Sequence, residues 1–211
     1  SRENNAIRAY AAPFSHNFCP FLDTRPGVAP EERYRALAGI HSGGGLFAFV
    51  SPDGIRWKMQ GPHPVITSDA LDFDSKNAYF WSETEWCYLC YLRTWETPHG
   101  RLRTISRTCS ENFAQWTEPV PLTPNAPGEH LYTSGTHPYF RAPHLYIALP
   151  TRFMPDRGSS TDIMFMTSRG GHQYDRTFQE AFIRPGLDPG SWGNRANYAA
   201  LGIHQTGPHE M

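Results

Sequence analysis

Polar residues that could bind a ligand recur in this chain at a spacing of 60 residues. Each of four similar apolar segments opens on Asn or His, and further polar residues lie at or just before three of these openings. The set is His16, Asn17, Asp74, Asn77, His137, Arg195 and Asn197. Amide, imidazole, carboxylate and guanidinium groups all hydrogen-bond polar ligands. If the four segments are equivalent strands of a repeated unit, we expect these side chains to converge on one polar pocket. The alternative is that Asn and His cap the turns that lead into strands.

A second marker keeps nearly the same period. A serine stands six residues before an aromatic residue in SPDGIRW (51–57), SENFAQW (110–116) and SRGGHQY (168–174). In the first of these, Asp53 can hydrogen-bond its own backbone and Gly54 accepts a positive φ, which is typical of a β-turn between two strands. Two markers at one period predict a propeller or another repeat architecture.

The segments between the markers read as strands. Each period divides into about four short apolar segments separated by turn signals, and the 18 Gly and 19 Pro favour many turns. No segment keeps a helical period for more than two turns. We therefore expect one all-β propeller domain over 1–211, with repeats at 17–76, 77–136, 137–196 and 197–211. Propellers typically have four to eight blades, so these repeats predict that the chain is part of a longer polypeptide.

Composition argues against some classes of partner. With 19 basic and 20 acidic residues, the formal net charge is −1, so we expect neither a nucleic acid nor a membrane partner. No apolar run approaches the roughly 20 residues of a membrane span. The N-terminal SRENNAIRAY has no apolar signal core, so a secreted or periplasmic location is left open. Cys87 and Cys90 form a C-x-x-C within a strand-like run, where they point to opposite faces, and we expect buried cysteines.

Five segments carry a resemblance to a known group of proteins. They are HNFCPFLDTRPGVAPEERYRALAG (16–39), GLFAFVSPDGIRW (45–57), FDSKNAYFW (73–81), HPYFRAPHLYIALPTRF (137–153) and RPGLDPGSWGNRANY (184–198). Together they resemble bacterial glycoside-hydrolase-family-32-like proteins. That group is similar to families 43 and 68, which share a five-bladed β-propeller. The resemblance implies a partial five-bladed propeller for this chain.

The resemblance also implies a chemistry. Enzymes of those families carry three carboxylates at the axial mouth, because a glycosidic oxygen leaves only when an acid protonates it while a second carboxylate attacks or activates water. The corresponding candidates here are Asp74 as the orienting or base carboxylate and Glu129 as the acid, with Asp23 in reserve. The Asn-Asp-Pro and Arg-Asp-Pro marks of those enzymes are absent from this chain.

Further side chains could contact a sugar. Arg141 and Arg152 could hold a hydroxyl, carboxylate or sulfate through bidentate bonds, and Trp81 and Trp95 could stack on pyranose rings or pack between sheets. His137 and His144 fall short of the three convergent ligands that a zinc site needs, so no metal or other cofactor is expected.

The predicted function is cleavage of a glycosidic bond in an oligo- or polysaccharide. Two alternatives stay open: a non-catalytic propeller that binds glycan or serves as a scaffold, and phosphorolysis, in which the basic residues of HPYFRAPH hold phosphate.

Overall fold

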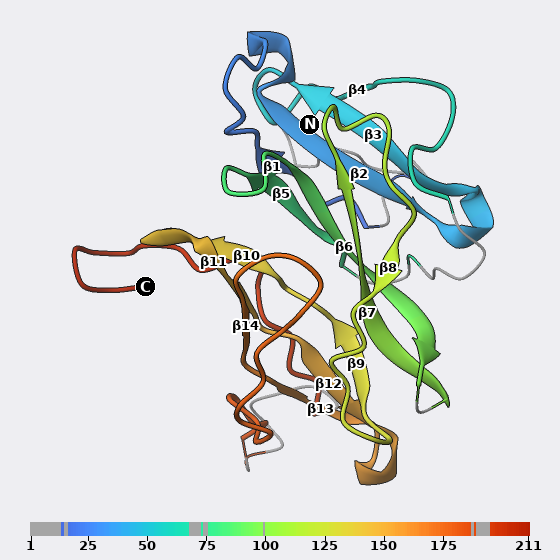
Figure 1. Cartoon of the computed structure of the whole chain (residues 1–211), viewed down its shortest axis with the longest axis vertical. Coiled ribbons are helices and arrows are strands. Elements are labelled where there is room, and N and C mark those ends of the chain that lie inside the picture. Colours follow the sequence, from blue (N-terminus) through green and yellow to red (C-terminus); the bar gives the residue numbers. More distant parts are fainter. Residues whose placement is uncertain are drawn as a thin grey trace.

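The computed structural model describes residues 14, 17–67, 73, 76–98, 100–186, 188 and 195–211. Over these residues the chain is all-β, as the sequence predicts, and its strands form four antiparallel sheets (Figure 1). The described helices are three single 3-10 turns: η1 (Pro30–Glu32), η2 (His41–Gly43) and η3 (Pro155–Arg157). The arrangement is propeller-like.

Two sheets are complete four-stranded meanders. The first sheet contains β1 (Phe21–Leu22), β2 (Tyr34–Ile40), β3 (Gly45–Ser51) and β4 (Lys58–Met59), in that order. The second sheet contains β5 (Ala78–Ser82), β6 (Cys87–Thr97), β7 (Gly100–Ser110) and β8 (Val120–Pro121). Each sheet falls within one predicted repeat, and β5 begins directly after Asn77.

The third repeat is split between two sheets. The third sheet contains β10 (His137–Tyr139), β11 (Ala142–Ala148) and β14 (Met166–Ser168), and the fourth contains β9 (His130–Thr133), β12 (Thr151–Met154) and β13 (Ser160–Ile163). The apolar segment HLYIALPTRF (144–153) reads as one strand in the sequence, but the structure divides it between β11 and β12. Pro150 lies at this break, where it has no N–H to donate to a ladder. Its carbonyl still accepts a hydrogen bond from the Met164 amide at 2.9 Å.

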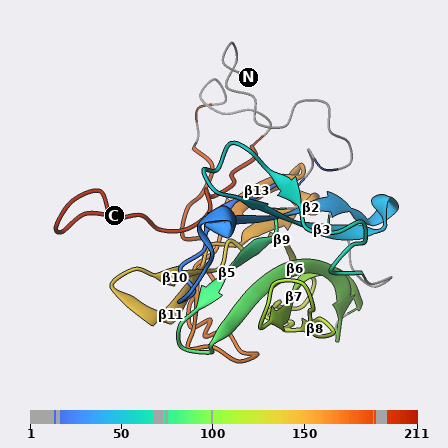
Figure 2. The same cartoon turned by 90° about the horizontal axis from the view of Figure 1, so that it is seen from above.

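One end of the sheets carries an additional layer. β5 pairs only with Cys87–Tyr91 of β6, so the rest of the β6–β7 hairpin projects beyond the point where β5 begins. β12 and β13 project beyond the start of β10 in the same way, and β9 lies between β12 and β7. We call this end, made of β9, β12, β13 and the projecting part of β6 and β7, the mouth. It is the lower end of Figure 1. Seen from above, the first sheet, β6–β8 and β10–β11 occupy three different sides around β5 (Figure 2).

The apolar core fills the spaces between neighbouring sheets. One cluster joins the first and second sheets and includes Leu37, Tyr79, Tyr88 and Phe113. Another joins the second and third sheets and includes Phe80, Leu89, Tyr91, Tyr146 and Met166. The second sheet therefore buries both of its faces, as expected of a blade packed between two others, and aromatic residues supply much of the buried area.

The hydroxyl of a tyrosine in the second sheet bonds backbone groups of the first sheet that lie outside its β1–β2 ladder. The Tyr79 hydroxyl donates to the carbonyl of Leu37 at 3.0 Å, and it accepts from the amides of Leu37 at 2.8 Å and Cys19 at 3.2 Å. The β1–β2 ladder pairs Phe21 and Leu22 only, so this hydroxyl satisfies backbone groups beside the ladder.

The serine–aromatic marker forms the predicted turn. Ser51 Oγ accepts from the Gly54 amide at 2.9 Å, and the Trp57 indole donates to the Gly54 carbonyl at 2.9 Å. The second copy repeats both bonds at 2.8 and 3.2 Å, with Phe113 in the place of Gly54. Both residues have positive φ, +74° and +66°. These turns lie at the end of the sheets opposite the mouth.

Candidate functional site

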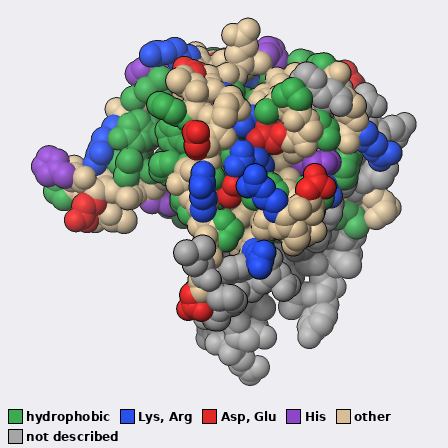
Figure 3. All heavy atoms as spheres, turned by 90° about the horizontal axis from the view of Figure 1, so that it is seen from below, with side chains coloured by type: hydrophobic (Ala, Val, Ile, Leu, Met, Phe, Trp, Pro, Cys, Tyr) green, Lys and Arg blue, Asp and Glu red, His purple; other side chains and the backbone are tan. Residues whose placement is uncertain are grey.

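The mouth carries a strip of stacked arginine and aromatic side chains. Alternation along the strands brings these residues to one face. The Arg103 guanidinium lies 4.4 Å from the Trp95 ring centroid, 5.4 Å from Tyr132 and 5.1 Å from Phe153. Arg93 lies 4.9 Å from Tyr132, and Arg101 lies 5.4 Å from Trp95. We call these six residues the arginine–aromatic strip. Figure 3 views the molecule from this end and shows Lys and Arg side chains gathered near the middle of the face, with acidic side chains among them.

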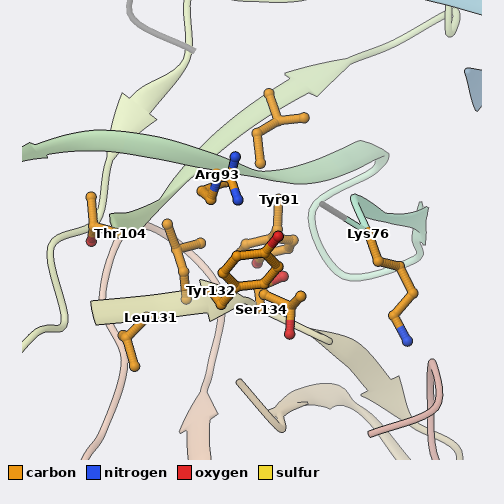
Figure 4. Close-up of a pocket in the computed structure, with 10 residues that line it drawn as sticks. Lys76, Tyr91, Arg93, Thr104, Leu131, Tyr132 and Ser134 are labelled. Atoms are coloured by element: carbon orange, nitrogen blue, oxygen red, sulfur yellow. The ribbon is translucent and has the colours of Figure 1, made fainter. Parts of the chain in front are cut away.

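Three of the four repeat openings meet beside this strip. The Lys76 ammonium, next to Asn77, donates to the carbonyl of Ala199 at 2.7 Å. The Tyr132 and Tyr198 rings lie 5.9 Å apart, edge to face. Ser134 and Tyr132 precede His137 and line one narrow seam together with Lys76 and residues of β6 and β7 (Figure 4). The seam is too tight to admit a water molecule, so a ligand would sit over it, where 54 % of Tyr198 is exposed.

The residues that open the first three repeats have different contacts and burial in the structure. The Asn17 amide donates to the carbonyls of Gly39, at 3.2 Å, and Phe73. Asn77 is 1 % exposed, and its side-chain amide has no hydrogen-bond partner within the described part of the chain. The His137 ring packs 5.6 Å from Phe80, and burial lowers the pKa of this histidine.

The last opening is attached to β13. The Thr161 amide donates to the carbonyl of Arg195 at 2.9 Å, and its hydroxyl donates to that of Asn197 at 3.0 Å. His16 and Asp74 lie outside the described residues. A role in ligand binding stays a prediction for every opening residue.

Asp23 lies in a buried ion pair between the first and second sheets. Its carboxylate accepts from Arg35 at 2.6 Å, from the Tyr88 hydroxyl at 2.6 Å and from the backbone amide of Arg25 at 3.0 Å. The side chain is fully buried. These donors occupy both carboxylate oxygens, and Arg35 bonds Glu32 as well, at 2.5 Å.

Glu129 lies in a different ion-pair network, at the mouth. Arg176 donates to its two carboxylate oxygens at 2.5 and 2.8 Å, and Arg152 lies 3.6 Å away. Arg152 in turn donates to both oxygens of Asp162, at 2.9 and 2.7 Å. Glu129 and Arg152 line an open hollow of about 300 Å³ with Phe153 and η3. The structure thus brings two predicted residues together, while Asp23 shares no recorded contact with either of them.

Two other predicted contacts lie away from the mouth. Arg141 is in the β10–β11 turn, where it bonds the Tyr139 hydroxyl at 3.3 Å and the carbonyl of Pro208 at 3.2 Å. Trp81 is 6 % exposed and belongs to the core between the first two sheets. A sugar could reach this ring only if the surrounding core opened.

Sequence reasoning missed several residues of the mouth. Arg93, Arg101, Arg103, Tyr132 and Tyr198 were not among the candidates. For the three arginines, the signal is the two-residue spacing that places Arg93 with Trp95 in RTW and Arg101 with Arg103 in RLR on one face of a strand.

The described residues hold no group of three or more His, Cys, Asp or Glu side chains placed to bind a metal ion. Cys90 is fully buried, as predicted, whereas Cys87 is only half-buried. Its partial burial still raises the pKa of the Cys87 thiol to about 12. Within the described ranges, no helix is both long and apolar enough to cross a membrane.

Two solved structures similar to this chain are described as carbohydrate-active enzymes. An N-acetylgalactosamine deacetylase from F. plautii, in complex with blood group B trisaccharide, matches with a TM-score of 0.53 and 13 % identity over 76 % of this chain and 52 % of its own. A glycoside hydrolase and a BT0996 complex with RGII each match with a TM-score of 0.51 and 12 % identity, over 72 % of this chain and 50 % of theirs.

At these identities the likeness concerns the fold, and the chain spans about half the length of the solved structures it matches. No protein-family model matches the sequence, and neither does any curated protein. The resemblance to family-32-like proteins therefore stays a prediction.

Proposed function

We propose that this chain binds a glycan at the mouth and is part of a larger carbohydrate-active protein, of five blades if the family-32-like resemblance holds. The observation that carries the proposal is the meeting of three repeat openings beside the arginine–aromatic strip. Exposed aromatic rings bind the apolar faces of sugars, while guanidinium groups bind hydroxyl or acidic substituents. The fold it shares with carbohydrate-active enzymes supports the same conclusion.

Within the mouth, Tyr198 is the most accessible recorded ring. It is 54 % exposed and is held edge to face by Tyr132, which in turn stacks with Arg93 and Arg103. A sugar ring resting on Tyr198 would lie within reach of polar side chains from three repeats. This arrangement suits an extended oligosaccharide better than a small buried ligand, because the seam beneath is closed.

The test is a binding screen of the chain on a panel of soluble oligosaccharides, followed by calorimetry on the best ligand. Tyr198→Ala should weaken binding roughly tenfold, since aromatic stacking contributes on the order of 1 kcal/mol beyond its buried area. The matched control is Trp86→Ala, because Trp86 is also exposed, at 63 %, but lies in the β5–β6 turn at the opposite end. Equal loss in both variants, or no binding to any glycan, would overturn the proposal.

A second candidate is hydrolysis of the bound glycan. It is favoured by the hollow that Glu129 and Arg152 line, whose volume of about 300 Å³ is at the lower end of ligand pockets. Asp23 is engaged in its own buried ion pair, so Asp74 is the sequence candidate that is left for the second carboxylate. Glu129 would have to leave its ion pair with Arg176 to act as the acid. Release of reducing ends should disappear in Glu129→Gln and in Asp74→Asn while glycan binding persists; hydrolysis that survives both substitutions would exclude this mechanism.

A further inference from the structure

The hollow beside Glu129 has the size and the lining of a site for one sugar unit. Its volume of about 300 Å³ is at the lower end of ligand pockets, so it suits a single ring better than a whole chain. Phe153, Met154 and Pro127 give it apolar surface, and charged side chains complete the lining. Apolar walls with a few polar groups are the usual composition of a site for a small molecule.

The charged groups of the hollow balance one another. Its lining includes the carboxylates of Glu129 and Asp156 and the guanidinium groups of Arg152 and Arg157. A carboxylate only accepts hydrogen bonds and a guanidinium group only donates them, whereas a hydroxyl group does both. Two negative and two positive groups therefore favour a neutral ligand that is rich in hydroxyl groups over an ion of either sign.

Two of these four groups are available to a ligand. Glu129 and Arg152 are already engaged in the ion-pair network at the mouth. Asp156 and Arg157 are exposed, and within the described residues neither makes a recorded hydrogen bond or ion pair. Both belong to η3, so one acceptor and one donor line the hollow from the same short turn.

The hollow adjoins the surface on which the proposed glycan rests. Phe153 lines the hollow, and its ring lies 5.1 Å from the Arg103 guanidinium, which lies 5.4 Å from the Tyr132 ring. Tyr132 in turn holds Tyr198 edge to face at 5.9 Å. Three successive contacts thus connect the hollow with Tyr198, and a chain of a few sugar units is long enough to cover them.

We propose that the hollow is a subsite for a neutral sugar unit of the same glycan that rests on Tyr198, so that the mouth selects oligosaccharides long enough to occupy both places. Asp156 and Arg157 bond the hydroxyl groups of the unit in the hollow, and Phe153 contacts its apolar face. This inference rests on the proposed glycan-binding function and specifies its ligand class.

The experiment measures how affinity depends on chain length. Calorimetry would compare cello-, malto- and xylo-oligosaccharides of one to six units. In at least one series we expect affinity to rise about tenfold at the length that first reaches the hollow, because a hydrogen bond to a charged group contributes about that much. Added salt should leave this step in affinity unchanged, since salt screens interactions between charges and the bound unit carries none.

Variants assign the step in affinity to the hollow. The double variant Asp156→Ala with Arg157→Ala should remove the step, so that the longer and shorter members of a series bind with similar affinity. Arg169→Ala is the matched control, because Arg169 is also exposed and follows β14, away from the mouth. Both proteins should melt at the wild-type temperature, since Asp156 and Arg157 make no recorded bond within the described part of the chain.

Each other result has a defined meaning. Equal affinity for all lengths of a series that binds would refute the inference and leave the proposed function standing, whereas binding of no series would count against both. A step that persists in the double variant would place the additional contact elsewhere on the surface and overturn the inference. A step that weakens as salt is added would show that the bound unit is charged and would overturn the neutral ligand class.

Discussion

Removing the Tyr79 hydroxyl should weaken the joint between the first and second sheets. In Tyr79→Phe the ring keeps its packing, but the amide and carbonyl of Leu37 and the amide of Cys19 lose a hydrogen-bond partner. A buried polar group left without a partner costs roughly 1 kcal/mol or more. With three such groups, the free energy of unfolding should fall by about 3 kcal/mol.

Tyr91 provides the matched control. It is also a buried tyrosine of the second sheet, 2 % exposed, but its hydroxyl has no hydrogen-bond partner within the described residues. Tyr91→Phe removes a buried polar atom without stranding another. Its free energy of unfolding should stay unchanged or rise by up to about 1 kcal/mol.

The assay is equilibrium unfolding in urea, followed by tryptophan fluorescence and far-UV circular dichroism and fitted with a common slope. The reasoning fails if the two variants change stability equally, or if Tyr79→Phe costs less than about 1 kcal/mol. A change in slope would instead show that the substitution altered how much surface unfolding exposes.

Three further perturbations test other parts of the structure. Gly54→Ala should lower the free energy of unfolding in urea by about 1 kcal/mol. A Cβ at this position meets only ordinary contacts at 3.8 Å, so the loss comes from holding an alanine at a φ of +74°. An unchanged free energy of unfolding would contradict this reasoning. Glu129→Gln should lower the free energy of unfolding, measured by thermal unfolding, by about 3 kcal/mol, since it leaves the buried guanidinium of Arg176 without its charged partner. An unchanged free energy of unfolding would show that this ion-pair network does not stabilise the fold. Burial lowers the pKa of His137 below its usual 6.5. The unfolded chain therefore binds a proton at a higher pH than the folded chain, and stability should decline as the pH falls below about 6.5. A series of melting curves at different pH should lose this part of the decline in His137→Gln, and a pH profile identical to the wild type would contradict the assignment.

Much of the fold follows from local sequence signals. The turn at Ser51–Trp57 uses hydrogen bonds within seven residues, so its chemistry is visible in the sequence, and the copy at Ser110–Trp116 repeats it. The all-β class follows from the same short-range features. The division of the third repeat was not predicted, because β9 pairs with β12 across a connection that no local pattern specifies.

The site was less accessible to sequence reasoning, since its partnerships are non-local. Asp23 and Glu129 are both candidates by position, but their surroundings depend on Arg35 and Arg176, and the latter lies 47 residues from Glu129 along the chain. The strip at Trp95 alternates visibly, but alternation alone does not say which face of a strand meets solvent.

The most direct test of glycan binding at the mouth is a titration followed through the indole N–H signals of ¹⁵N-labelled protein. Trp95 stands beside Arg101 and Arg103, whereas the indoles of Trp57 and Trp116 donate hydrogen bonds in turns at the opposite end. The Trp95 signal, assigned by its loss in Trp95→Phe, should shift progressively with added glycan while the signals of Trp57 and Trp116 stay in place. Binding that shifts Trp57 or Trp116 and leaves Trp95 unmoved would contradict the account.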